Sequence, residues 1–324
     1  LTRKGVVDAQ DIRFFDSKST YTYQSGLTLL GGGKKKIKQL RQSKWMMLPF
    51  HSHHMKDNVS MVVPENNEIR TECNGSFYYD QLIIASGTQP VPEKIPGLQE
   101  ALDDRACPVG SIYIPKYALK YNQLRENLKL NRKEGKIEAL FTQPASPIKC
   151  GGAPQKILHL SHEEWDSNKL DVEYSFLTGT PAIFPSPHYV EALTKQMESK
   201  GVKIHLESEL VSVDGNKRTA TFRNTSTNES FEKSFDILHA TPICVPPEFL
   251  TESGLASANG YADVNINTLM HNKYTNIWAL GDSANLPTSK TSSAVNAQIW
   301  VLTENLRQMR SGVPIEELSG RYEG

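Results

Sequence analysis

One pattern of strands and turns occurs twice in this chain, and it restricts the folds that the chain can adopt. The first copy alternates apolar and polar residues over 59–63, resumes over 68–72, and rises into an apolar third strand over 77–85 after a turn at Asn74-Gly75. Alternation with a period of two is typical of half-buried strands, and tight turns join antiparallel neighbours. The sequence therefore predicts a three-stranded antiparallel flap.

The second copy repeats this order further along the chain. Its strands are predicted over 210–213, 219–222 and 235–242, and the third strand is again apolar and again ends in a turn. A repeat of this kind indicates two domains that are built alike.

A strand, a helix and a further strand come before the second flap. Ser186 is the expected N-cap of the helix, Pro187 takes its first position and Gly201 ends it, before a short alternating strand over 202–206. Strand, crossover helix, strand and flap make up a dinucleotide-binding unit. We therefore predict an α/β fold with two dinucleotide-binding (Rossmann-like) domains, each with a three-stranded antiparallel flap.

Composition excludes several classes of protein. Lysine and arginine (36) balance aspartate and glutamate (36), so no net charge attracts nucleic acid, and we expect no nucleic-acid partner. The four cysteines are widely spaced, unlike zinc ligands or a disulfide scaffold. His51, His53 and His54 have no carboxylate or cysteine partners nearby, so we predict no metal site. No run approaches the ~20 apolar residues of a membrane-spanning helix.

A single thiol, Cys150, stands in a glycine-bearing turn between a strand predicted over 137–142 and a helix predicted over 155–164. Such turns bind phosphates, because backbone N–H groups and the helix dipole attract an anion. Lys149 and the helix N-terminus would equally stabilise a thiolate, which is the reactive form of cysteine. Cys150 is therefore the candidate nucleophile; the alternative is a buried small side chain in a tight turn.

Two aspartates each follow an apolar strand. In flavoproteins with two such domains the first domain holds FAD, and Asp16, after a strand at 12–15, is placed to accept a hydrogen bond from the adenosine ribose. This acid comes ~20 residues after the glycine loop, so we expect that loop upstream of Leu1. Gly281 lets the backbone approach a ligand, and Asp282 would accept from a ribityl hydroxyl; an ordinary strand-to-turn ending is the alternative.

Taken together, these segments resemble the sulfide:quinone oxidoreductases of the mitochondrial type, within the wider family of flavoprotein disulfide reductases. The resemblance covers nearly the whole chain. The Lys-Cys-Gly-Gly-Ala-Pro segment and the long segment from Gly-Asp to Lys-Thr are specific. The segments that carry the resemblance are residues 20–24, 82–87, 147–156, 238–242 and 281–291.

The resemblance implies that FAD is the cofactor and that Cys150 lies beside its flavin ring. It also implies a second redox cysteine beyond residue 324 and a C-terminal region, likewise absent here, that attaches the protein to a membrane. Lys290 would hold positive charge near the pyrimidine side of the flavin. The residues that the resemblance assigns to FAD are Asp16, Gln24, the backbone around Val59, Ala85, Ser86, Gly87 and Asp282.

In this arrangement residues 1–104 and 240–324 would form the FAD-binding domain, and residues 105–239 would form the second Rossmann-like domain, which carries the redox cysteine. The implied reaction is the FAD-dependent oxidation of hydrogen sulfide through a cysteine persulfide. Electrons would pass to ubiquinone, and a small thiol or sulfite would accept the sulfur. The implied location is the inner mitochondrial membrane, where the protein would be peripheral.

Two alternatives stay open on the sequence. A NADH:quinone oxidoreductase of the same build needs a glycine fingerprint after the strand at 137–142, and the turn at 147–154 replaces that fingerprint. A catalytically incomplete fragment or pseudoenzyme would keep the flavin-binding scaffold without turnover. An upstream glycine loop and a downstream cysteine in the full transcript would argue against the fragment.

Overall fold

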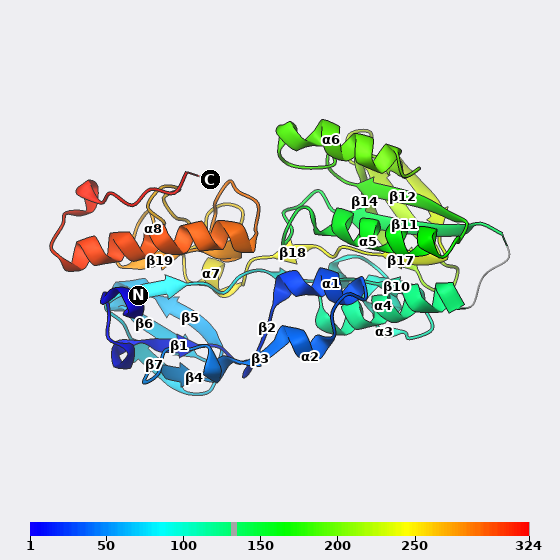
Figure 1. Cartoon of the computed structure of the whole chain (residues 1–324). Coiled ribbons are helices and arrows are strands. Elements are labelled where there is room, and N and C mark those ends of the chain that lie inside the picture. The colour runs from blue at the N-terminus through cyan, green and yellow to red at the C-terminus, as the bar shows by residue number, and fades with distance from the viewer. Residues whose placement is uncertain (131–134, 324) are drawn as a thin grey trace. The chain divides into compact units, whose positions relative to one another are not determined.

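The computed structural model describes residues 1–130 and 135–323 and has the predicted α/β fold. The chain divides into two compact units (Figure 1). Unit 1 comprises Leu1–Thr22, Arg41–Gln89 and Val245–Gly324, and unit 2 comprises Tyr23–Leu40 and Pro90–Cys244. The chain thus changes unit at other positions than the predicted boundaries after residues 104 and 239. The assignment of residues 1–104 and 240–324 to FAD, and of 105–239 to the redox cysteine, stays a prediction.

A five-stranded parallel sheet forms the centre of unit 2. The three inner strands β17, β11 and β12 are buried along almost their whole length, as expected where helices cover both faces of a sheet. The strand order is β10-β17-β11-β12-β13. The bounds are β10 (Val109–Gly110), β11 (Ile137–Gln143), β12 (Val172–Thr178), β13 (Lys203–His205) and β17 (Ile237–His239).

Helices complete unit 2, where α4 contacts β10 and β17 and α5 contacts β11. The helix predicted after Ser186 is present as α6, with Ser186 in extended conformation before it and Gly201 at φ +68° after it. The Ser186 side chain makes no capping hydrogen bond. The bounds are α1 (Leu27–Gly31), α2 (Ile37–Leu40), α3 (Leu98–Asp103), α4 (Pro115–Leu130), α5 (Ala153–Ser167) and α6 (Pro187–Glu198).

Both predicted flaps are present, one in each unit, as antiparallel sheets of order β5-β6-β7 and β14-β15-β16. The first is built from β5 (Val59–Val63), β6 (Glu68–Thr71) and β7 (Gly75–Tyr78). The second is built from β14 (Ser208–Asp214), β15 (Thr219–Asn224) and β16 (Ser230–Ser234).

The predicted third strand of the first copy is wrong as one element. Residues 77–85 divide between β7, which stays in the flap, and β8 (Leu82–Ile84), which pairs in parallel with β19 (Ile277–Ala279). The break at Asp80-Gln81 is needed because the chain must leave an antiparallel partner and join a parallel one. The second copy was predicted wrongly in another way: its flap is closed by β16, which ends before the predicted strand over 235–242 begins, and residues 237–239 of that strand form β17, which joins the parallel sheet.

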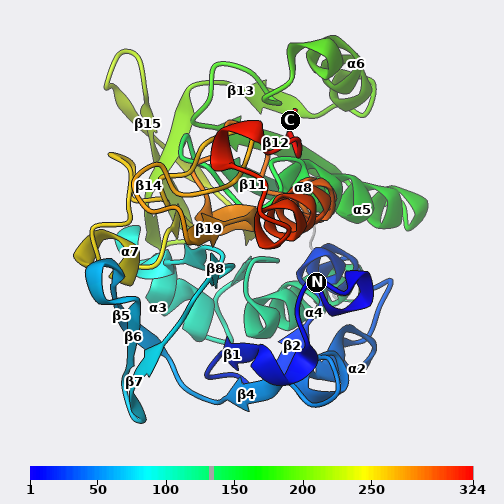
Figure 2. The same ribbon diagram turned by 90° about the vertical axis from the view of Figure 1, so that its left-hand side faces the viewer.

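Unit 1 is held together by an apolar core around β8, β19 and α8 (Ser292–Arg310), with Trp278 wholly buried in it. Figures 1 and 2 both show α8 beside β19. Two further strand pairs belong to this unit, a parallel pair β1-β4 and an antiparallel pair β2-β3. The remaining bounds in this unit are β1 (Arg13–Phe15), β2 (Thr20–Thr22), β3 (Arg41–Ser43), β4 (His53–Met55) and α7 (Phe249–Glu252). In β9 (Gln89–Pro90) and β18 (Cys244–Val245), one residue belongs to unit 1 and the other to unit 2.

Candidate functional site

Asp16 lies in unit 1 at the carboxyl end of β1, as the sequence predicted. Its backbone N–H donates to Met55 O at 3.1 Å, which continues the pairing of β1 with β4. One carboxylate oxygen accepts from the backbone N–H of Lys18 at 2.9 Å, and the other pairs with the ammonium group of Lys44. Burial lowers the pKa of Lys44. The carboxylate is thus fixed in orientation while 43% of the side chain stays exposed.

The residues assigned to FAD around the first flap lie at strand ends. Val59 opens β5, while Ala85, Ser86 and Gly87 follow β8, with Gly87 at φ +70°. The next residue, Thr88, was not singled out from the sequence. Its hydroxyl is buried and has no hydrogen-bond partner among the described residues, so this turn presents a polar atom that a ligand could satisfy.

The Gly281-Asp282 ending of β19 has the geometry of a close backbone approach. Gly281 has φ +69°, and a Cβ there would come within 3.3 Å of Val295. Its backbone N–H donates to Gln298 Oε1 at 2.7 Å, and Gln298 is 2% exposed on α8. Asp282 follows in a single 3-10 turn, and a small hollow in unit 1 is lined by both Asp282 and the first turn of α8. The N-terminus of a helix favours negative charge in such a hollow.

Lys290 lines the same hollow, and its ammonium group makes several contacts. It donates to Asp282 O at 2.8 Å and to Ala284 O at 3.3 Å, and it lies 3.9 Å from the centre of the Tyr261 ring. Lys290 therefore braces the loop after Gly281 and also brings positive charge to it.

Cys150 lies in unit 2, in the turn between β11 and α5. Its φ is +57°, a left-handed conformation that costs a residue with a side chain roughly 1–2 kcal/mol. The turn is closed by the backbone N–H of Ala153, which donates to Cys150 O at 2.8 Å. Gly152 is the N-cap of α5, so the thiol is held one turn before a helix of 15 residues. A cysteine kept where glycine costs less is a candidate for chemistry.

The structure brings Lys156 to this thiol, and the sequence analysis missed it. Its ammonium nitrogen lies 3.6 Å from the Cys150 sulfur. The spacing was readable, since Lys156 comes one helical turn after the N-cap of α5, but many lysines share such spacing. Lys149, the expected cation, lies beside Cys150 in sequence and is half-buried.

Two hydroxyls lie beyond the carboxyl ends of neighbouring parallel strands of the unit 2 sheet. Tyr113 follows β10 and Thr241 follows β17, and both side chains are buried. Neither hydroxyl makes a hydrogen bond of good geometry in the described part of the chain, although the two lie close enough for Thr241 to act on the pKa of Tyr113. Burial raises the pKa of Tyr113 well above its ordinary range, and the nearby Cys244 and Cys150 thiols raise it further. Tyr113 and Cys244 belong to one apolar cluster, and Cys150 packs against that cluster.

His239 supports this end of the sheet in the neutral form. It is wholly buried, and burial lowers its pKa to about 3. Its Nε2 accepts from the backbone N–H of Ile112 at 3.2 Å, and its ring stacks on Phe141. This contact ties β17 to the segment that leads into Tyr113.

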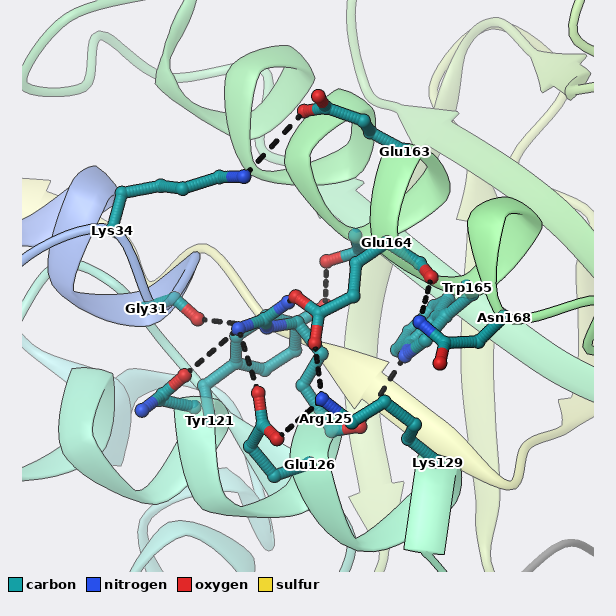
Figure 3. A network of polar contacts seen from close by, with 12 residues as sticks. Gly31, Lys34, Tyr121, Arg125, Glu126, Lys129, Glu163, Glu164, Trp165 and Asn168 are labelled. Atoms are coloured by element: carbon teal, nitrogen blue, oxygen red, sulfur yellow. Dashed lines mark hydrogen bonds and ion pairs between the residues drawn. The ribbon is translucent and has the colours of Figure 1, made fainter.

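A buried guanidinium fixes α5, the helix that follows Cys150 (Figure 3). Arg125 on α4 is 1% exposed, pairs with Glu164 on α5 and donates from Nε to Gly31 O at 3.3 Å. Trp165 Nε1 donates back to Arg125 O at 3.3 Å. Lys129 pairs with the same Glu164 at 3.0 Å. The network joins α1, α4 and α5, so the end of α5 distant from Cys150 is fixed by charge.

The predicted site residues therefore fall into two groups. Asp16, Val59, the Ala85 to Gly87 turn, Asp282 and Lys290 belong to unit 1. Cys150 belongs to unit 2, and so does Gln24, which is exposed in a short 3-10 helix. Their roles toward a cofactor stay predictions.

Within residues 1–130 and 135–323, no helix has the length and apolar character needed to span a bilayer. The same residues hold no cluster of three or more His, Cys, Asp or Glu side chains that suits a metal ion.

Comparison with curated proteins places the chain among close relatives. It is 35% identical over 319 residues to "Sulfide:quinone oxidoreductase, mitochondrial" of Schizosaccharomyces pombe, covering 97% of this chain and 68% of the relative. The protein of the same name from Mus musculus is 33% identical and is covered to 69%, and that from Dictyostelium discoideum is 32% identical and is covered to 68%. These relatives do not favour the two alternatives. The search against protein-family models gave no match.

Solved structures with the same fold include the sulfide:quinone oxidoreductase of Aquifex aeolicus, with a TM-score of 0.78 and 14% identity over 94% of this chain and 72% of that one. A chain of the Tetrahymena thermophila mitochondrial ATP synthase assembly gives a TM-score of 0.79 at 22% identity, over 96% of this chain and 75% of that one. A NADH oxidase from Lactobacillus brevis gives a TM-score of 0.61 at 16% identity, over 96% of this chain and 65% of that one. At these identities the likeness concerns the fold alone.

Proposed function

The chain belongs to the mitochondrial sulfide:quinone oxidoreductase family, and we propose that it oxidises hydrogen sulfide with FAD and passes the electrons to ubiquinone. As a member of this family it is a flavoprotein oxidoreductase. The observation that carries the proposal is the Cys150 turn. The backbone of Cys150 has a positive φ, and its thiol lies before a helix N-terminus, 3.6 Å from the Lys156 ammonium group.

The residues proposed to hold FAD fit a nucleotide in their chemistry. Asp16 offers carboxylate oxygens for ribose hydroxyls, and Asp282 offers the same to the ribityl chain. The positive φ of Gly87 and of Gly281 lets the backbone come close to a ligand, and the buried Thr88 hydroxyl supplies a further polar contact. The other residues proposed for the cofactor are Gln24, Val59, Ala85, Ser86 and Lys290.

Cys150 is the proposed catalytic residue. In the oxidised enzyme we propose that its sulfur is bonded to a second cysteine, and hydrosulfide attacks that second sulfur. The sulfur–sulfur bond breaks, the second cysteine keeps the added sulfur as a persulfide, and Cys150 leaves as a thiolate that carries the electron pair. FAD, when bound, takes up such an electron pair and delivers it to a quinone.

The residues around Cys150 favour this step. The Lys156 ammonium group and the N-terminus of α5 both stabilise a leaving thiolate. Tyr113 keeps its proton because burial raises its pKa, so its hydroxyl can donate a hydrogen bond. Lys290 and the first turn of α8 provide positive potential on unit 1, where the cofactor would gather negative charge.

A small thiol or sulfite is the proposed acceptor of the persulfide sulfur, and the second cysteine is released as a thiolate. The cycle closes when the two cysteines form their sulfur–sulfur bond again and give up the electron pair that the cofactor would accept. The protein is proposed to be mitochondrial, as the names of its relatives are, and peripheral to the inner membrane through a C-terminal region. Of the other cysteines, Cys73 is exposed in a flap turn and Cys107 is buried in a different apolar cluster, while Cys244 is buried in the Tyr113 cluster against which Cys150 packs.

The test is anaerobic absorbance spectroscopy of the flavin-loaded protein. Sulfide should bleach the flavin band of the complete wild-type protein, and a ubiquinone analogue should restore it. Cys150→Ser should abolish bleaching, while Cys73→Ser should leave it unchanged because Cys73 lies in an exposed turn of the first flap and has no part in the proposed chemistry. Full bleaching of the Cys150→Ser variant would refute the assignment.

A further inference from the structure

Four large apolar side chains project from one short loop of unit 1, residues 45–50. Trp45 is 68% exposed, Met46 84%, Met47 49% and Phe50 83%. Single exposed apolar residues are ordinary on protein surfaces, but a contiguous group usually marks a binding surface. We call this segment the 45–50 loop.

The 45–50 loop is held at both of its ends, so its side chains are displayed by an ordered turn. Before it, Lys44 N–H donates to Ser19 O at 3.0 Å, next to the pairing of β3 with β2. After it, His53 N–H donates to Ile12 O at 2.9 Å, where β4 joins β1. Inside it, Met47 N–H donates to Lys44 O at 2.8 Å. Packing in unit 1 therefore leaves the apolar side chains outward.

The strands that brace the loop are basic. Residues 13–20 and 41–56 contain five lysine or arginine residues and a single acid, Asp16, which is already paired with Lys44. The exposed basic residues are Arg13, Lys18, Arg41 and Lys56. A second copy of the chain would bring two such basic surfaces together, so like-charge repulsion disfavours self-association through this face.

We propose that the 45–50 loop is a membrane contact, with Trp45, Met46 and Phe50 entering the interfacial zone of an anionic bilayer and the basic residues around them facing lipid headgroups. Tryptophan is favoured at this depth because its ring is apolar with one polar edge, and basic side chains are attracted to the anionic leaflet. This surface would be additional to the proposed C-terminal attachment, and it lies on the unit that carries Asp16.

The chain contains a matched control for this loop. Trp300 on α8 is 61% exposed, close to the value for Trp45, but the charged groups near it are of both signs. The Lys4 ammonium group covers its ring at 4.8 Å, and the acid Glu304 lies one turn along the helix. If exposure alone decided membrane binding, Trp45 and Trp300 would contribute equally, whereas the proposal predicts that only Trp45 contributes.

The test is co-sedimentation of the purified chain with vesicles of phosphatidylcholine, with and without about one fifth phosphatidylserine. We expect binding to the anionic vesicles and at least about tenfold weaker partitioning for Trp45→Ala/Phe50→Ala. Arg41→Glu/Lys56→Glu should lose the preference for anionic lipid. Trp300→Ala should bind as the wild type does, and circular dichroism checks that each variant is folded.

Fluorescence adds a second readout. In a Trp300→Phe background, brominated lipid should quench Trp45, since Trp165 and Trp278 are wholly buried. Equal binding by the loop variant, equal binding to neutral vesicles, or a loop-dependent change of oligomeric state without vesicle binding would overturn the proposal, the last outcome indicating a protein partner. The vesicle assay contains no sulfide or quinone, so a negative result in it would leave the proposed sulfide oxidation unaffected. A negative result in the sulfide assay would likewise leave the proposed membrane contact unaffected.

Discussion

Replacement of Lys156 by methionine should slow the alkylation of Cys150 about tenfold. The Lys156 ammonium nitrogen lies 3.6 Å from the Cys150 sulfur, on the exposed side of the turn. Opposite unit charges at that distance attract by about 1 kcal/mol in bulk water and by about 5 kcal/mol at an effective dielectric of 20. Because the pair is partly exposed, a value near the lower limit applies, and about 1.4 kcal/mol corresponds to a factor of ten.

The assay is the rate of iodoacetamide modification, followed for each cysteine by mass spectrometry of its peptide. Cys73 provides an internal reference because it is exposed, and the nearby Asp57 carboxylate is the main cause that raises its thiol pKa. It should react slowly in wild type and variant alike. Cys107 and Cys244 are buried and should be protected in both. The quantity to compare is therefore the ratio of the Cys150 rate to the Cys73 rate.

Two controls separate charge from shape. Lys156→Arg keeps a cation near the sulfur and should retain most of the rate, while methionine keeps only an apolar chain of similar length. The separation of 3.6 Å is shorter than the screening length of about 10 Å at 0.1 M salt, so the effect should survive moderate ionic strength. An unchanged ratio in Lys156→Met would show that Lys156 does not stabilise the thiolate, and the proposed electrostatics of this turn would be wrong.

Two further predictions concern the stability of unit 2. Arg125→Met leaves Glu164 without its buried partner and should lower the free energy of unfolding by about 3 kcal/mol in urea titrations. The control Lys34→Met breaks an exposed pair with Glu163 at 3.9 Å and should change the free energy of unfolding by less than about 0.5 kcal/mol. Equal effects of the two substitutions would refute the role of burial. The pKa of His239 is lowered to about 3, so between its ordinary value of ~6.5 and 3 only the unfolded chain binds the proton, and the stability of the folded chain falls as the pH falls through that window. The urea concentration at the unfolding midpoint should therefore be lower at about pH 5 than at about pH 7, and the decrease should be smaller in His239→Gln. Parallel pH profiles of the wild type and the variant would contradict this.

Much of the fold was predictable because its signals are local. The alternation over 59–63 and the turn at Asn74-Gly75 are properties of a few adjacent residues, and both flaps are present. The predicted strand over 77–85 was wrong as one element because its division depends on β19, almost 200 residues later in the chain. Periodicity alone contains no information about such a partner.

The candidate site divides in the same way. Cys150 stood out because a cysteine occupied a turn that suits glycine, and the structure gives it a positive φ. Lys156, Tyr113 and Thr241 were missed. A lysine in a helix and hydroxyls after strands are common, and only their neighbours make them distinctive.

By itself the sequence determined the two flaps, the crossover helices and the placement of a thiol at a helix start, since each follows from the backbone preferences of neighbouring residues. The tertiary structure alone decided that Tyr113 and Thr241 both follow the carboxyl ends of the paired strands β10 and β17, that Arg125 is buried against Glu164, and that the 45–50 loop faces outward. These arrangements depend on the order in which distant strands pair and on which side chains the packed helices cover, and those choices are made by the whole chain as it folds.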